Sequence, residues 1–199
     1  MSAPASAPLP TAPSGDAAAR RRPRLAPFVA IAVAAVLALF VVLLATRDTA
    51  ATRVGKSPLV GKQAPAIEGR TAAGDTFSLD RLQGRWVLVN FFATWCTPCK
   101  AEHPELVKFA DAHRVKGDAE VVSVAFSDTP QNVAAFFKEH GGTWPVLVEN
   151  TGTVAIGYGV AQVPESYLVA PDGLVAAKLI GGVRASDVDA LLARFGASS

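Results

Sequence analysis

The hydrophobic positions of the chain form one long uninterrupted run, followed by a series of shorter runs that polar turns separate. The long run covers residues 28–45, eighteen residues without a charged or strongly polar side chain. At roughly 1.5 Å per residue it is about 27 Å long, close to the ~30 Å hydrocarbon core of a membrane. Because the run has no polar face, a buried helix of a soluble domain is disfavoured. The pattern predicts one transmembrane helix.

The net charge of +2 is distributed unevenly along the chain. Residues 1–27 hold four arginines and one aspartate, hence +3, and residues 28–45 hold no charge, so the remainder sums to −1. The tail 1–27 is rich in Ala, Pro and Ser, has too little apolar bulk to fold, and is predicted to be disordered. Its basic cluster beside the span favours a cytoplasmic N-terminus and an exported C-terminal part. It does not indicate a nucleic-acid-binding face.

The apolar span 28–45 could be either a cleaved signal peptide or an uncleaved signal anchor. Small residues at 45 and 50–51 would suit a cleaved signal peptide, but the span is longer than the usual apolar region of about 7–15 residues, so an uncleaved signal anchor is favoured. Residues 46–61 are polar with scattered Gly and Pro, as in a linker. Residues 62–197 have the length of one ordinary domain. The sequence therefore predicts a single-pass protein of the cell membrane whose folded domain is extracytoplasmic.

Within 62–197, short β-rich runs alternate with amphipathic ones. A turn at 73–75 divides residues 66–79 into a hairpin, and residues 86–92 and 121–126 are continuous apolar runs typical of strands buried on both faces. The further expected elements are helices over 99–112, 130–140 and 187–195, a short helix over 151–158, a strand over 146–148, and a hairpin over 166–170 and 174–180. This order predicts an α/β domain with a mixed sheet covered on both faces.

Both cysteines of the chain, Cys96 and Cys99, lie where the strand 86–92 gives way to a helix. Their spacing lets the two sulfurs meet across one helical turn. The helix N-terminus stabilises a thiolate at Cys96, the predicted nucleophile, and Cys99, one turn deeper, would resolve a mixed disulfide. A redox-active disulfide is favoured over a structural one, which usually closes a longer loop. It is also favoured over a zinc site, which usually needs four N or S ligands.

The sequence around the cysteines resembles the active-site segment of the thioredoxin superfamily, because WCTPCK at 95–100 follows VLVNFFA at 87–93. More narrowly, residues 62–197 resemble the TlpA/ResA/CcmG (DsbE) group of membrane-tethered thioredoxin-like proteins, within the redoxin (AhpC/TSA) superfamily. Further matching segments are GKQAP at 61–65, EHP at 102–104, YGV at 158–160, VPESY at 163–167 and PDG at 171–173. The resemblance implies a thioredoxin fold with an N-terminal β-hairpin and a central insertion. It implies no flavin, haem or metal.

The resemblance also assigns roles to residues near the cysteines. Pro164 matches a cis-proline beside the dithiol, and the backbone of Val163 would pair with an extended substrate peptide. Glu102 matches a glutamate that tunes cysteine protonation; if buried, it would have a raised pKa and could relay a proton from Cys99. An ordinary strand-initiating proline and a solvated glutamate are the alternatives. The expected substrate-contacting surface further includes Trp95, Thr97 and Pro98.

Two sequence features bear on proton handling and direction. Asn90 stands where many thioredoxins carry a buried aspartate, which leaves Glu102 as the candidate for proton handling. The CTPC motif lacks the histidine of strongly oxidising relatives and shares Pro98 with reductive TlpA-like ones, which favours a reductase.

The implied partners of such a reductase are a membrane dithiol carrier as electron donor and exported proteins with cysteine pairs, such as apocytochrome c during cytochrome c maturation. A disulfide-forming oxidase is the main alternative. A peroxiredoxin is disfavoured because its motif Pro-x-x-x-Thr-x-x-Cys is absent, and a non-catalytic binding module because both cysteines are present.

Overall fold

A computed structural model describes residues 26–45 and 52–196 of the chain, which divides into two compact units, 1–47 and 48–199. Of the first unit, helix α1 is described, Ala26–Ala45, with its side chains over 27–42. Within these described residues, no helix combines the length and the apolarity needed to cross a membrane. The structure therefore does not show the predicted anchor. The predicted disordered tail lies outside the described residues except for its last two positions, which begin α1.

The second unit is built on a six-stranded mixed sheet in the order β1-β8-β7-β4-β5-β6. Strands β4, β5 and β6 are parallel to one another, and β7, β8 and β1 are added by antiparallel pairing. Strand β4, the predicted buried strand, lies inside the sheet, and all its residues except Trp86 are buried. The strands are β1 Arg53–Gly55, β4 Trp86–Phe92, β5 Ala119–Phe126, β6 Val146–Glu149, β7 Glu165–Val169 and β8 Val175–Ile180.

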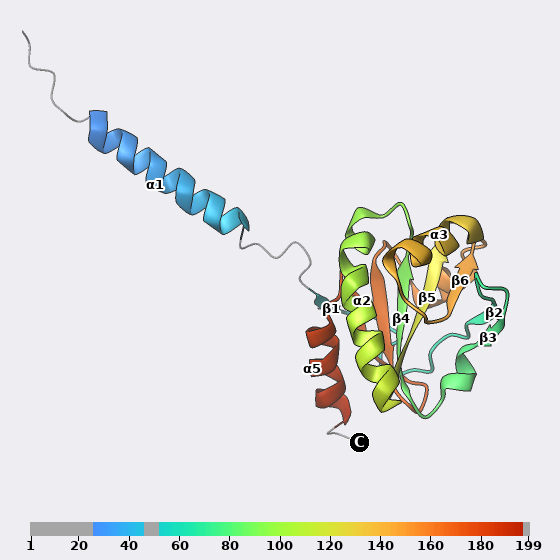
Figure 1. The fold of residues 1–199 in the computed structure, drawn as a ribbon. Helices are drawn as coiled ribbons and strands as arrows, with labels where there is room; N and C mark the ends of the chain where they lie inside the picture. Colours follow the sequence, from blue (N-terminus) through green and yellow to red (C-terminus); the bar gives the residue numbers. More distant parts are fainter. Residues whose placement is uncertain (1–25, 46–51, 197–199) are drawn as a thin grey trace, which may run out of the picture. The chain divides into compact units, whose positions relative to one another are not determined.

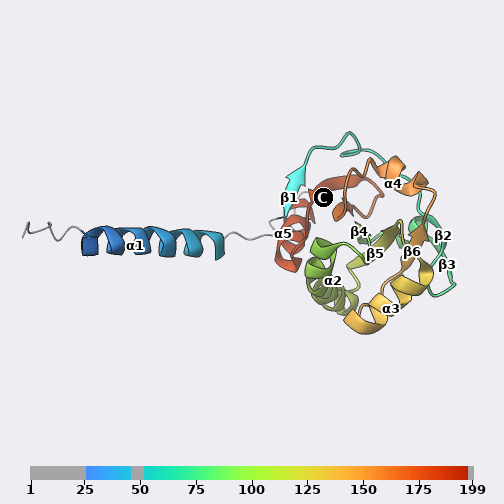
Figure 2. The same cartoon turned by 90° about the horizontal axis from the view of Figure 1, so that it is seen from above.

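Each face of the sheet carries an apolar core. Helices α2, α3 and α5 lie on one side of the sheet, and α4 lies on the other (Figures 1 and 2). On one face, Leu106 and Phe109 of α2 and Phe136 of α3 pack with residues of α5 against β4 and β5. On the other, Phe77 and Tyr158 contribute to a core under the β2–β3 hairpin and α4. The remaining elements are α2 Thr97–Lys116, α3 Pro130–His140, α4 Thr153–Tyr158, α5 Ala185–Gly196, β2 Glu68–Arg70, β3 Thr76–Ser78 and the 3-10 helix η1 Leu79–Leu82.

Both predicted hairpins are present as β2–β3 and β7–β8. Helix α2 is longer than predicted and ends at Lys116. It is capped by Gly117, whose φ of 69° is the left-handed conformation that suits glycine after a helix. The paired part of the domain also begins before residue 62, because Arg53–Gly55, inside the predicted linker 46–61, pair with β8. This strand is mostly exposed, so it carries no alternating apolar pattern from which it could be read.

Candidate active site

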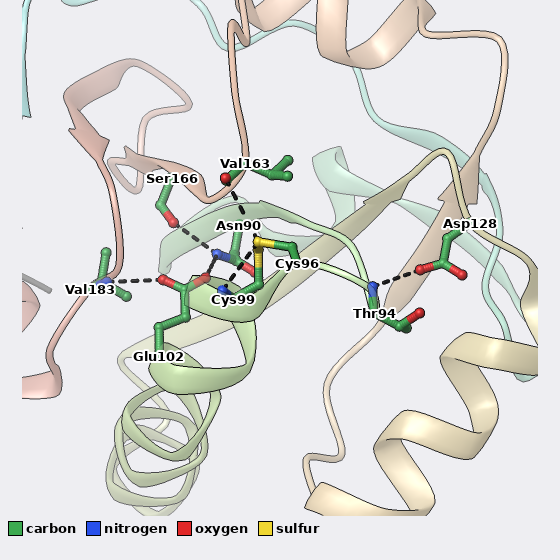
Figure 3. The surroundings of a disulfide bond; sticks show 9 residues. All are labelled: Asn90, Thr94, Cys96, Cys99, Glu102, Asp128, Val163, Ser166 and Val183. Carbon is green, nitrogen blue, oxygen red and sulfur yellow. Dashed lines mark hydrogen bonds between the residues drawn. A yellow bond between two sulfur atoms is a disulfide. The ribbon is translucent and has the colours of Figure 1, made fainter. Parts of the chain in front are cut away.

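Cys96 and Cys99 lie at the N-terminus of α2, at the end of the turn that follows β4, and form a disulfide with a Cα–Cα distance of 5.2 Å (Figure 3). Cys96 is the N-cap residue of α2, and its Sγ accepts a hydrogen bond from the backbone N–H of Cys99 at 3.2 Å. Both residues are buried. After reduction, a thiolate at Cys96 would therefore face an N–H donor and the positive end of the helix dipole.

A buried aspartate holds the turn in front of the disulfide. The carboxylate of Asp128 accepts the backbone N–H of Thr94 at 2.7 Å and that of Thr129 at 2.8 Å. Burial opposes its ionisation, but hydrogen bonds from Thr94 and its neighbours outweigh this cost and lower the pKa of Asp128. Asp128 is not among the site residues expected from the sequence, because its partner in the turn lies 34 residues away.

The predicted substrate-contacting residues occupy the surface around this turn. Trp95 is 60% exposed, although its Nε1–H donates to the carbonyl of Ser127 at 3.1 Å. Thr97 and Pro98, in the first turn of α2, are exposed as well. An exposed ring beside buried sulfurs offers apolar contact area to an incoming peptide.

The loop between α4 and β7 brings a second segment to the disulfide. Its Val163–Pro164 peptide bond is cis, as the resemblance implies. The carbonyl oxygen of Val163 lies 3.7 Å from the Sγ of Cys96. Val163 is half-buried and Pro164 is buried. The structure thus places the backbone of Val163 directly beside the first cysteine.

Glu102 is buried beneath the disulfide, with 1% of the residue exposed. Its Oε1 accepts the Asn90 side-chain amide at 2.9 Å, and its Oε2 accepts the backbone N–H of Val183 at 2.9 Å (Figure 3). Burial raises the pKa of Glu102 to about 7, and the hydrogen bonds from Val183 and Asn90 oppose that rise. Glu102 follows Cys99 by three residues, so the two share a helix face. The alternative of a solvated helix glutamate is wrong.

Asn90 links Glu102 to the neighbouring strands β5 and β7. Its amide also donates to Ser166 at 3.1 Å, and its carbonyl oxygen faces the Ser123 hydroxyl at 3.5 Å. Ser123 in turn accepts the indole N–H of Trp144 at 2.8 Å. From the sequence, Asn90 was noted only as the residue that replaces a buried aspartate, and no hydrogen-bonding role was predicted for it. The sequence did contain a signal for such a role, because Asn90 is one amide within an otherwise apolar strand. A polar group buried in this way needs hydrogen-bond partners.

Comparison with known proteins places this site in a family. Residues 60–178 match the AhpC/TSA family. The chain belongs to the AhpC/TSA family. This AhpC/TSA chain is 31% identical over 122 residues to "Thiol-disulfide oxidoreductase ResA" of Bacillus thuringiensis (strain Al Hakam), an alignment that covers 61% of the chain and 70% of the relative. It is 34% identical over 143 residues to "Thiol:disulfide interchange protein HelX" of Rhodobacter capsulatus, covering 68% of the chain and 78% of the relative.

A solved structure supports the same assignment. The thioredoxin-family thiol:disulfide interchange protein from Chlorobium tepidum TLS superposes with a TM-score of 0.62 at 25% identity, covering 70% of this chain and 98% of that one. The AhpC/TSA chain accordingly has a thioredoxin-like α/β fold with a mixed sheet. It is a thiol–disulfide oxidoreductase of the thioredoxin type, similar to ResA.

Proposed function

We propose that this protein is a membrane-anchored, extracytoplasmic reductase of disulfides in exported proteins, with apocytochrome c as its substrate during cytochrome c maturation. The observation that carries the proposal is a Cys96–Cys99 disulfide at the N-cap of α2, with the protonatable Glu102 buried beneath it. The chain has two cysteines, and both are in this bond.

The chemistry is a dithiol–disulfide exchange. In the reduced protein, the Cys96 thiolate attacks one sulfur of the substrate disulfide, forms a mixed disulfide and releases the other substrate sulfur as a thiolate. Cys99 then attacks Cys96, restores the Cys96–Cys99 bond and releases the second substrate thiol. Two electrons pass to the substrate. Glu102 takes the proton of the Cys99 thiol, a role that suits a carboxylate whose pKa is about 7.

The substrate peptide is proposed to bind across the turn and the cis-proline loop. An extended segment would pair with the backbone of Val163, next to Pro164, and place its own sulfur near Cys96. The exposed ring of Trp95 and the first helical residues Thr97 and Pro98 would line the other side. These contacts place one substrate sulfur within reach of the N-cap thiolate.

The direction and the location of the reaction rest on sequence features. The CTPC motif has no histidine between its cysteines, and arginines at 20–24 precede the apolar run 28–45. The proposed electron source is a membrane dithiol carrier, because a reductant in an oxidising exterior must be resupplied. Recovery of the full chain in the membrane fraction, and its loss from that fraction on deletion of residues 1–47, would support the anchor.

The deciding experiment is the reduction potential of the purified full chain, equilibrated against a glutathione series at pH 7. A value of about −270 mV or lower supports the reductase, because reduced Cys96 and Cys99 can then donate electrons. A value near −120 mV, about that of a strong periplasmic oxidant, replaces it with the disulfide-forming oxidase. A Cys96→Ser variant with full exchange activity would overturn both.

A further inference from the structure

A buried ion pair lies at the base of the loop that carries Val163. The Nζ of Lys178, on β8, is 2.8 Å from Oε2 of Glu165, the first residue of β7, and the two side chains are 9% and 2% exposed. Glu165 pairs in register with Ile180 and Tyr167 with Lys178, so the ion pair crosses the two strands diagonally. Removing two charges from water is costly, so a pair placed here calls for an explanation beyond strand pairing.

Both charged groups also bind the backbone of the loop 159–164. The ammonium of Lys178 donates to the carbonyl of Gly159 at 3.2 Å, at the start of the loop. The carboxylate of Glu165 accepts the N–H of Ala161 at 3.4 Å, in its middle. The end of the loop is held by the N–H of Gly181, which donates to the carbonyl of Pro164 at 3.1 Å. The backbone N–H groups of Gly159 and Val160 also bond to the end of α4. Of the hydrogen bonds that join the loop to β7 and β8, those of Gly159 and Ala161 depend on the ion pair.

The surroundings keep Lys178 charged. Burial opposes the ammonium, but the hydrogen bond to Glu165 and the interaction with Tyr167 outweigh burial and raise the pKa of Lys178. The ammonium also lies 5.4 Å from the centre of the Tyr167 ring, whose hydroxyl binds the carbonyl of Tyr158 just before the loop. Lys178 thus stays charged across the neutral pH range.

We infer that Glu165 and Lys178 are positioning residues for substrate binding, because their ion pair fixes the loop 159–164 and so places the Val163 backbone for an extended cysteine-bearing peptide. The inference deepens the proposed function and rests on it. The pair makes no contact with the sulfurs among its described interactions and acts through the loop. A loop already ordered before binding avoids the entropy cost of ordering it on the substrate.

The test compares a peptide substrate with a small one. The reduced full chain reacts with a synthetic peptide that contains an oxidised Cys-x-x-Cys-His segment, and separately with hydroxyethyl disulfide, over a range of concentrations. The variant Glu165→Leu/Lys178→Met replaces the pair by apolar side chains, a change that is often neutral for stability. The matched control is Arg85→Met/Glu120→Leu, which removes an exposed ion pair with an N–O distance of 3.6 Å.

For the double variant, we expect the half-saturation concentration for the peptide to rise roughly tenfold, as the loss of about 1.4 kcal/mol of binding would produce. Its limiting rate, its reduction potential and its rate with hydroxyethyl disulfide should match those of the wild type. The single variant Lys178→Arg keeps the charge beside Glu165. Its half-saturation concentration for the peptide should therefore stay close to that of the wild type. If the double variant does not fold, Lys178→Gln, which keeps an amide donor near Gly159, takes its place in the same comparison.

Different results would separate the two ideas. A folded variant with wild-type half-saturation for the peptide overturns the positioning role and leaves the reductase proposal intact. An equal loss of rate with peptide and with hydroxyethyl disulfide also overturns it, because a purely structural defect has that signature. A wild-type chain that reduces hydroxyethyl disulfide but not the peptide overturns the proposed function, and the positioning role with it.

Discussion

Replacing Glu102 by glutamine should abolish a pH dependence of stability that this one side chain imposes. The pKa of Glu102 rises from an ordinary 4.5 to about 7 through burial. Between these values the folded protein holds a proton on Glu102 that the unfolded chain has already released. The free energy of unfolding therefore falls as the pH rises through this window and is level above about pH 8. For Glu102 alone, the loss between pH 5 and pH 8 is roughly 2–3 kcal/mol.

The assay is urea unfolding of the disulfide form at pH 5 and pH 8, for wild type and for Glu102→Gln. Because His103 has a pKa lowered by burial, it adds a slope of the opposite sign in both proteins. The difference between the two proteins isolates the contribution of Glu102. The free energy of unfolding of the variant minus that of the wild type should be roughly 2–3 kcal/mol larger at pH 8 than at pH 5. Glu105→Gln, on the same helix, is the control and should keep the wild-type slope because Glu102 is still present. A Glu102→Gln variant with the wild-type slope would refute the reasoning.

Three further outcomes are expected. Cys99→Ser should accumulate a mixed disulfide with the peptide, seen by mass spectrometry, whereas Cys96→Ser should form none; an adduct on the latter would reverse the assigned roles. Asp128→Ala should cost about 1–3 kcal/mol in urea unfolding, because two backbone N–H groups lose their acceptor; a change under about 0.5 kcal/mol would contradict the role in the turn. Trp144→Phe should cost about 1 kcal/mol through the lost bond to Ser123, and an unchanged midpoint would speak against that bond.

The parts of the fold that the sequence predicts are those in which neighbouring residues carry the information. The apolar run of β4 and the turn between β2 and β3 are local patterns, and the structure has both where they were expected. The position of the disulfide at the start of α2 follows from the same local reasoning. Burial of Glu102 could be expected only through the resemblance, because its helix position alone also suits a solvated side chain.

The remaining parts depend on which strands become neighbours. Lys178 meets Glu165 only because β7 and β8 pair in one particular register, and a slip of one residue would turn the lysine to the other face. Asn90 reaches Glu102 because β4 lies under α2, and Asp128 reaches Thr94 because the end of β5 lies beside the turn after β4. Each of these contacts joins segments that only the tertiary structure brings together.

The distance along the chain between Cys96 and Val163 has a consequence for biosynthesis. The two lie 67 residues apart, and β7, which follows Val163, pairs with β4 next to the cysteines. A chain made from its N-terminus therefore contains both thiols well before β7 has been synthesised. With two cysteines in the sequence, the nascent chain can form one internal disulfide, and that is the native one. The incorrect disulfides open to it are therefore bonds to other proteins. Synthesis of β7 then brings Val163 beside Cys96, where its carbonyl oxygen lies 3.7 Å from the sulfur.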